Sequence, residues 1–478
     1  MKRFSLIISA LMGSVMGAVA QTQPAPKTFT LQACIEYALE NSIALNNAKL
    51  DEQIAQAKVN ETIGVGLPQV SGTGTLMHNE KLPRFFNRYS GPGGFIDFGS
   101  IPGIEVGDVV AAENFFQLKS SADVGLTVNQ LIFNGSYLVG LQASKTYKEL
   151  SYKATAQSKE QIIQQVTKAY YTVLINKERA DLFASNIARV DSLLKNTTAL
   201  YENGFAESID ADRIQVTLNN LIVERDKFLN MNELGVALLK FQMSYPMNEP
   251  IDIVGNIQDV QVDVDLDSYQ QDWNYKERPD YQVMEVNKRL QELNIKNKFA
   301  ASLPTLSGFF NYGYSTQSPN IGGLFKTNSG FSEVPGAGPD KWYDYSNYGL
   351  SLNIPIFTGL QNRYKVQQEK IVMQKINNGF RNLKSSIDLE IQQATLNYDN
   401  AIKSLNAQQR NIALAEKVAR VTKIKYEQGV GSNLEVIDAE DALRQAQTNY
   451  YSAMYDAMVA KIDLDKAYGK LVASPETN

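Results

Sequence analysis

The stretch Val124-Gly-Leu-Thr-Val-Asn-Gln-Leu-Ile-Phe133 alternates apolar and polar side chains, and residues 135–202, which follow it, contain no proline. Alternation with a period of two is typical of a β-strand that has one apolar and one polar face. The proline-free segment holds a single interior glycine, Gly140. An uninterrupted helix of that length would be on the order of 100 Å long. A short strand joined to a very long helix is therefore the unit that we expect to decide the fold.

The same plan returns in the second half of the chain. The segment Tyr348-Gly-Leu-Ser-Leu-Asn-Ile-Pro-Ile-Phe357 again alternates, and residues 359–427 again lack proline. Each long segment ends in a matching turn sequence, Tyr201-Glu-Asn-Gly204 and Tyr426-Glu-Gln-Gly429. A helix is expected to run back from each turn. A repeat of more than 200 residues that occurs twice indicates duplication of one unit.

The first long segment carries an apolar seam that also points to helical hairpins. The seam has a 4-3-4-7 spacing, close to the seven-residue repeat of a coiled coil. Its members are Phe183, Ile187, Val190, Leu194 and Tyr201. The return helix is predicted from Ile209 to about Met243.

The remaining elements also occur in pairs. Thr30 is a plausible N-cap for a helix that is predicted to continue to about Ile63. A strand is predicted next, at 69–79, and then a long loop at 80–120, where no periodicity is sustained. The second half has corresponding segments: a helix at 278–301, a strand at 306–315, a loop at 316–343 and a strand at 347–354.

The faces of these strands indicate their surroundings. One face of each strand is apolar and the other is polar or glycine, as in the strands of a water-filled barrel that stands in lipid. The side chains predicted to face lipid are Val124, Leu126, Val128, Leu350 and Leu352.

The N-terminus indicates export. Lys2 and Arg3 precede an apolar run that closes on Ala18-Val-Ala20, a pattern that signal peptidase cleaves. We expect residues 1–20 to be a signal peptide, 21–250 the first repeat, 251–275 a linker and 276–478 the second repeat. With 46 Lys and Arg against 51 Asp and Glu, the chain has a formal net charge of −5. A net acidic chain without a basic cluster argues against nucleic acid as a partner.

Four strands cannot close a barrel alone. In hydrocarbon, an open sheet would expose two edges of unpaired N–H and C=O groups, each at a cost of several kcal/mol. Other copies of the chain must therefore supply the missing strands. Eight strands close around packed side chains, whereas the polar faces here call for a wider interior. Three chains and twelve strands are thus favoured over two chains and eight.

Enzymatic chemistry is not expected. One histidine, His78, and one cysteine, Cys34, cannot form a zinc cluster or a convincing catalytic triad. Cys34 is interpreted as a small residue on a buried helix face. Asp263, Asp265 and Asp267 have the spacing of a calcium loop, but its glycine and glutamate positions are not filled, so a solvated linker is the better interpretation. We therefore predict no catalytic, cofactor or metal site.

The order of these segments carries a family resemblance. The joints read Leu67-Pro-Gln-Val-Ser-Gly72 and Leu303-Pro-Thr-Leu-Ser-Gly308, with Gln130-Leu-Ile-Phe-Asn-Gly135 and Ile354-Pro-Ile-Phe-Thr-Gly359 before the long helices. With the duplicated turns, this arrangement resembles the TolC-type outer-membrane efflux proteins over essentially the whole mature chain. The resemblance implies a mainly α-helical homotrimer with a twelve-stranded transmembrane β-barrel, which is continued by a helical tunnel in the periplasm.

The resemblance also implies partners and site residues. The tunnel would dock onto a periplasmic adaptor protein and an inner-membrane pump of the resistance-nodulation-division (RND) or ABC class. Glu435 and Asp438 match the positions of acidic rings at the tunnel mouth. The arginine that latches the closed tip in the family is here Gly431, and Asp210, which matches its acidic partner, is expected to pair with Arg213 or to stay unpaired. The expected adaptor-docking residues are Gly204, Phe205, Ala206, Gly429, Val430 and Gly431.

Two other functions would account for part of this sequence pattern. A soluble coiled-coil adaptor would explain the long helices and export, but not four strands with apolar faces. An exit duct for a type I protein-secretion system stays open as the alternative, because the pump selects the cargo. For Glu435 and Asp438, a solvated helix face also stays open, since exposed acids on helices usually have that role.

Overall fold

The computed structural model describes residues 27–93, 102–114, 116–271, 273–326 and 342–471. The predicted signal peptide lies outside these residues, as do parts of both predicted loops. The chain forms two compact units, and each unit takes residues from both predicted repeats. The division into repeats in chain order therefore stays a prediction about ancestry. Among the described residues, no helix is long and apolar enough to span a membrane.

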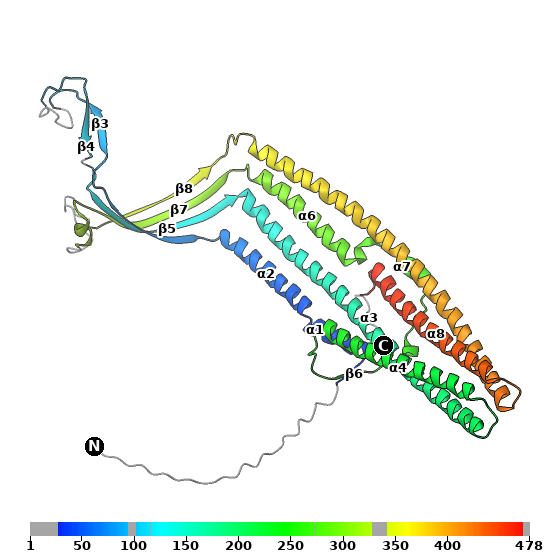
Figure 1. Cartoon of the computed structure of the whole chain (residues 1–478). Coiled ribbons are helices and arrows are strands. Elements are labelled where there is room, and N and C mark those ends of the chain that lie inside the picture. Colours follow the sequence, from blue (N-terminus) through cyan, green and yellow to red (C-terminus); the bar gives the residue numbers. More distant parts are fainter. Residues whose placement is uncertain (1–26, 94–101, 115, 272, 327–341, 472–478) are drawn as a thin grey trace, which may run out of the picture. The chain divides into compact units, whose positions relative to one another are not determined.

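The first unit comprises, in its described part, residues 27–48, 155–279 and 384–471. It contains α1 (Leu31–Asn41), α4 (Ser208–Met243), the short α5 (Leu266–Gln270), α8 (Asn433–Ala467) and the second parts of α3 (Gly135–Glu202) and α7 (Gln361–Glu427). Figure 1 shows α3 and α4 as one hairpin, and α7 and α8 as another. A parallel pair of three-residue strands, β1 (Lys27–Phe29) and β6 (Ile251–Ile253), joins the start of the unit to its middle.

The core of this unit forms where helices meet. Cys34 of α1 is fully buried beside Val166 of α3 and Leu239 of α4, as its interpretation as a core residue required. Burial also raises the pKa of the Cys34 thiol to about 12. The predicted seam of α3 packs against α4, with Phe183 and Phe228 at 5.3 Å between ring centroids. Tyr201 is the exception, because it is 48% exposed.

The second unit comprises residues 49–154 and 280–383, described with gaps. It holds most of α2 (Ile43–Val65) and α6 (Pro279–Ala300), and the first parts of α3 and α7. Its main sheet is antiparallel throughout, in the order β2-β5-β7-β8 (Figure 1). The strands span Gln69–His78, Ser120–Asn134, Thr305–Ser318 and Tyr343–Asn353. The four predicted strands are therefore present. β5 and β7 extend beyond their predicted bounds at both ends, whereas β8 begins four residues earlier and ends one residue earlier than predicted.

Two sequence predictions were wrong in detail. The first helix is not continuous, because Ser42 leaves the helical conformation and its hydroxyl accepts a bond from the amide of Leu45. Serine favours such a cap over a helix interior. The predicted loop at 80–120 contains an antiparallel hairpin of β3 (Arg84–Arg88) and β4 (Val109–Glu113). Neither strand alternates regularly, and some twenty residues separate the two strands. No local sequence pattern therefore predicted that they would pair.

The predicted loop at 316–343 is only partly described. β7 extends into it, and a short 3₁₀ helix follows at Ile321–Phe325. Residues 327–341 of this prediction lie outside the described part of the chain.

The predicted linker at 251–275 is ordered against α7. The hydroxyl of Tyr398 accepts a bond from the amide of Val264 and donates one to the carbonyl of Val262, both at 2.8 Å. Asp265 caps α5 by accepting a bond from the amide of Asp267. Its carboxylate thus has a structural role that needs no calcium ion.

Candidate functional site

The main sheet presents an apolar face that its register defines. Val124, Leu126 and Val128 of β5 stand opposite Tyr314, Tyr312 and Phe310 of β7. Because partners across a sheet share a face, these side chains form one apolar surface. Leu350 and Leu352 of β8 join it, opposite Gly308 and Leu306.

This surface is strongly exposed in the single chain. Leu350 is 70% exposed, Leu352 60%, and Val124 and Leu126 are each 54% exposed. A contiguous apolar surface of this kind marks contact with lipid or with another protein. The sheet also has two edges, β2 and β8, which have no further strand partner among the described residues.

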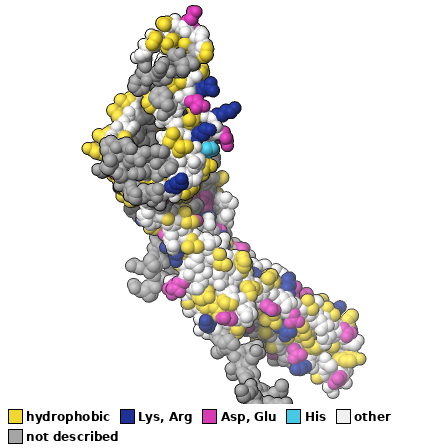
Figure 2. All heavy atoms as spheres, turned by 90° about the vertical axis from the view of Figure 1, so that its left-hand side faces the viewer, with side chains coloured by type: hydrophobic (Ala, Val, Ile, Leu, Met, Phe, Trp, Pro, Cys, Tyr) yellow, Lys and Arg dark blue, Asp and Glu magenta, His cyan; other side chains and the backbone are white. Residues whose placement is uncertain are grey.

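Charged side chains gather elsewhere in this unit. Figure 2 shows Lys, Arg, Asp and Glu side chains near the single histidine of the chain. His78, at the end of β2, lies with its Nδ1 2.8 Å from the hydroxyl of Ser120. The β3–β4 hairpin at the top of the same view exposes further apolar side chains, among them Phe86 and Val109.

The two turns between the long helices have the same construction. Gly204 donates to the carbonyl of Tyr201, and Phe205 to that of Leu200. Gly429 and Val430 repeat both bonds at the second turn. This is the Schellman pattern, which needs a residue with positive φ, and the φ angles of Gly204 and Gly429 are 80° and 76°.

Each turn exposes an apolar side chain directly after its glycine. Phe205 is 81% exposed and Val430 is 78% exposed, while Ala206 is half-buried. Gly431 has a different reason to be glycine. A Cβ there would lie 3.1 Å from both the Cβ of Lys425 and the amide nitrogen of Tyr426. A Cβ at this position would require those neighbouring atoms to shift by a few tenths of an ångström.

Glu435 and Asp438 lie in the first two turns of α8, and both are exposed. The hydroxyl of Ser432 caps this helix by accepting a bond from the amide of Glu435. Residues three apart on a helix project from neighbouring positions on one face. The two carboxylates therefore share a face of α8, close to the turn.

Asp210 and Arg213, the possible latch, lie near the start of α4. No ion pair joins them among the described residues, where Arg213 is exposed and Asp210 is half-buried. Instead, the side-chain amide (Nδ2) of Asn433 donates to the backbone carbonyl of Asp210 at 3.2 Å. The start of α8 is thus held to the start of α4 by a neutral contact.

A series of polar contacts, which sequence patterns did not predict, joins α3 to α8. Arg189 pairs with Glu440 at 3.3 Å, and the amide of Asn186 donates to Gln447 at 3.2 Å. Further contacts continue along both helices: Arg179–Ser452, Thr172–Tyr455 and Lys168–Asp463. The partner's number falls as that of α3 rises, so the helices run antiparallel. Only Asn186, a polar residue beside the apolar seam, could have suggested such a contact.

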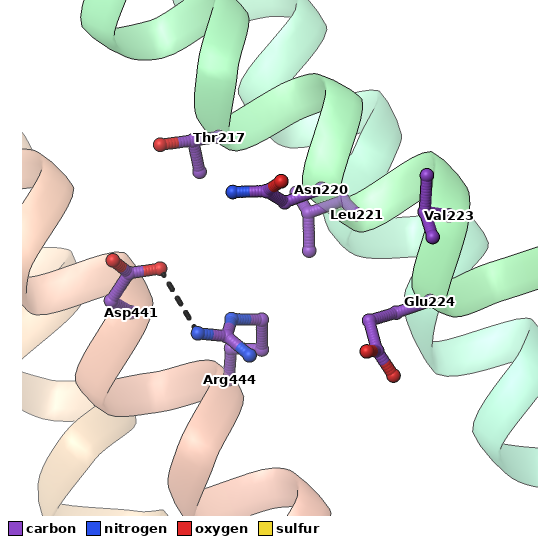
Figure 3. Close-up of a pocket in the computed structure, with 7 residues that line it drawn as sticks. All are labelled: Thr217, Asn220, Leu221, Val223, Glu224, Asp441 and Arg444. Carbon is purple, nitrogen blue, oxygen red and sulfur yellow. Dashed lines mark hydrogen bonds and ion pairs between the residues drawn. The ribbon is translucent and has the colours of Figure 1, made fainter.

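The contact between α8 and α4 is looser. Figure 3 shows Arg444 of α8 pointing toward α4, with Asp441 beside it and Glu224 across a cavity. The cavity has a volume of about 280 Å³. The charged nitrogen of Arg444 lies 3.4 Å from Asp441 on its own helix. α8 is thus joined by polar side chains to α3 and separated by a polar cavity from part of α4.

No group of three His, Cys, Asp or Glu side chains in the described ranges is arranged to hold a metal ion. The features that remain are the exposed apolar sheet face, the glycine turns and the acidic start of α8.

Comparison with known proteins gives these features a context. Residues 275–470 match the family model "Outer membrane efflux protein". The cation efflux system protein CusC of Escherichia coli (strain K12) is 28% identical over 201 residues, which are 40% of this chain and 39% of CusC. The chain thus matches about two fifths of the length of this relative. The outer membrane protein TolC of Vibrio cholerae is 20% identical over 351 residues, which are 73% of this chain and 76% of TolC.

Solved structures agree over a longer range. The MtrE outer membrane channel of Neisseria gonorrhoeae superposes with a TM-score of 0.68 at 19% identity, covering 94% of this chain and 91% of MtrE. This is a family of efflux channels rather than of enzymes. Residues 275–470 thus resemble the outer membrane efflux proteins, and the chain as a whole has the fold of the outer-membrane efflux channels.

Proposed function

We propose that this protein is the outer-membrane exit duct of a tripartite efflux system. It would conduct small molecules passively from an inner-membrane pump and a periplasmic adaptor to the outside. In this proposal three chains close a twelve-stranded barrel, and their long helices form a tunnel in the periplasm. The observation that carries the proposal is the four-stranded sheet with an exposed apolar face and two open edges.

The physical argument starts from these edges. In hydrocarbon, every backbone N–H and C=O must be paired, so a sheet in lipid must close on itself. β2 of one chain can pair with β8 of the next, which removes both edges at once. The polar face, which carries Thr127 and Asn129 of β5, then lines the pore.

We further propose that the two glycine turns dock the adaptor. Both turns expose an apolar side chain, at Phe205 and at Val430, on a fixed backbone. Apolar side chains held in place at a turn suit contact with a partner, because little conformational entropy is lost on binding. We assign the protein no enzymatic role, cofactor or resident metal. The adaptor and a pump of the RND or ABC class would be its partners.

Crosslinking tests both the docking site and the orientation. Cysteine at Ala206 or at Val430 is expected to crosslink to the adaptor in cells, because both positions lie in the turns. Cysteine at Val106, which is 73% exposed in the 80–120 segment, is the matched control and should give no adaptor product. The native Cys34 should not interfere, since it is fully buried.

The reverse pattern, with adaptor product only from Val106→Cys, would invert the proposed orientation. Absence of product from all three variants, at normal levels of protein and adaptor, would argue against docking at the turns.

A further inference from the structure

Two aromatic side chains on the polar face of the sheet lie against the sheet instead of standing away from it. Phe309 of β7 and Gly349 of β8 are register partners. A Cβ built on Gly349 would lie 2.8 Å from Cζ of Phe309 and 3.1 Å from its Cε1. These atoms belong to the far half of the ring. Side chains in strands normally stand roughly perpendicular to the sheet. The ring of Phe309 therefore extends across the backbone of β8.

Tyr345 of β8 shows the same behaviour over two strands. Its register row continues through Gly313 of β7 to Gly125 of β5. The tyrosine hydroxyl would lie 2.8 Å from a Cβ at Gly313 and 3.1 Å from a Cβ at Gly125. The carboxyl group of Asp123, also on β5, lies near this hydroxyl. The ring thus spans β7 in a trough that exists only because both residues there are glycine.

The exposures agree with this arrangement. Phe309 and Tyr345 are half-buried, although the main element outside the sheet that contacts β5 and β7 in the described part of the chain is the short 3₁₀ helix at Ile321–Phe325. Tyr348, on the apolar face of the same strand, is 84% exposed. The difference follows from the glycines beneath the two rings, because a ring that touches the backbone of its neighbour hides one of its own sides.

We propose that Gly349 and the pair Gly125 and Gly313 set the free width of the duct, because they let the rings of Phe309 and Tyr345 lie against its wall. The inference rests on the proposed function, in which the polar face lines a pore. In a trimer each ring occurs three times around the axis. A ring that stood upright would project into the lumen from three sides, so the largest molecule that could pass would become smaller.

Gly349 offers the cleanest test. The three atoms nearest to a methyl group there all belong to the ring of Phe309, which is the movable end of a side chain. The ring must lift, while the backbone can stay in place. At Gly313, by contrast, a methyl group would lie 2.7 Å from the backbone oxygen of Val124 and could prevent folding. Gly349→Ala therefore changes the position of one ring with little risk to assembly.

The readout is the size of molecule that reaches a reporter cysteine. Asn353 is on the same face of β8, four register rows beyond Phe309 toward the helices. In intact cells, thiol-reactive polymers of graded size can reach Asn353→Cys only from outside, past the level of Phe309. We expect a sharp size limit in this protein and a smaller limit when Gly349→Ala is added.

Two further variants complete the design. Phe309→Ala added to Gly349→Ala should restore the original size limit, and Phe309→Ala alone should leave it unchanged, since the ring already lies against the wall. Gly308→Ala is the matched control. It lies on the opposite face, its methyl group would make ordinary contacts of 3.5 Å and 3.7 Å, and no change is expected.

Equal size limits with and without Gly349→Ala, in assembled protein, would overturn the inference while leaving the duct in place. A larger limit in Phe309→Ala alone would also overturn it. If even the smallest polymers fail to label Asn353→Cys in otherwise unchanged, assembled protein, the proposed pore itself is wrong, and the inference fails with it.

Discussion

Arginine at Leu350 is expected to prevent stable assembly in the outer membrane, whereas arginine at the neighbouring Ser351 is expected to be tolerated. Leu350 is 70% exposed on the apolar face, and Ser351 lies on the polar face of the same strand. An arginine near the middle of a bilayer costs about 2–4 kcal/mol, while one that faces a water-filled lumen costs little. Each assembled trimer would contain three copies of the change. We therefore expect the assembled fraction of Leu350→Arg to fall by at least about tenfold.

The two variants control for each other because they differ by one position in a strand. Successive side chains of a strand point to opposite faces, so any general effect of arginine on β8 applies to both. The assembled protein in an outer-membrane fraction can be measured by its migration before and after heating. Equal assembly of the two variants would count against the assigned faces.

Removal of the charges at the start of α8 is expected to change ion conduction strongly. We propose that Glu435 and Asp438 form two stacked rings of three carboxylates at the periplasmic mouth of the trimer. Such rings in a constriction should attract cations and bind multivalent ones. We expect the closed pore to be cation-selective and blocked by multivalent cations added on the helical side. Glu435→Gln with Asp438→Asn should weaken that block about tenfold or more, which is equivalent to about 1.4 kcal/mol of binding free energy.

The structure supports assembly of this double variant. Both side chains are exposed, and in the described part of the chain neither forms an ion pair that the substitutions would break. The hydroxyl of Ser432, which caps α8, accepts a bond from the backbone amide of Glu435, and the substitution keeps that amide. Glu416→Gln, at an exposed acid on α7, is the control and should leave the block unchanged. Unchanged selectivity and unchanged block in the double variant, measured on single channels, would show that these acids are not at the mouth.

The long helices and strands were predictable because their signals are local. The long helix at Gly135–Glu202 has the predicted bounds, and the second begins at Gln361, two residues after the predicted start. Proline-free sequence between a strand pattern and a glycine turn determines such a helix without tertiary information. The two faces of the sheet were equally predictable, since a period of two assigns every side chain to one face.

Features that depend on distant partners were not predictable. The β3–β4 hairpin joins segments with irregular patterns, and Arg189 finds Glu440 some 250 residues away. No spacing rule relates such residues before the fold is known. The position of Phe309 over Gly349 belongs to the same class. In the sequence, the glycines only weaken the strand prediction. Their role is visible once the register is known, because it places the ring of Phe309 over Gly349 and the ring of Tyr345 over Gly313 and Gly125.

Gly431 illustrates the difference between what the sequence predicts and what only the structure shows. The family resemblance predicts an arginine at this position, where the chain has glycine. The structure places a Cβ at Gly431 3.1 Å from two neighbouring atoms, and it shows a neutral contact from the Asn433 side chain to the carbonyl of Asp210. This neutral contact and the polar contacts between α3 and α8 hold the start of α8 in place. We therefore expect that the tip does not need an ion pair between an arginine at position 431 and Asp210.

The central claim is that three chains close one barrel, and the number of chains in the particle tests it most directly. The protein should be extracted from the outer membrane in mild detergent and its mass measured by native mass spectrometry. We predict a single species of three chains, because twelve strands remove all open edges and leave a wide polar lumen. A stable particle of one or two chains that still conducts ions in a bilayer would contradict the account.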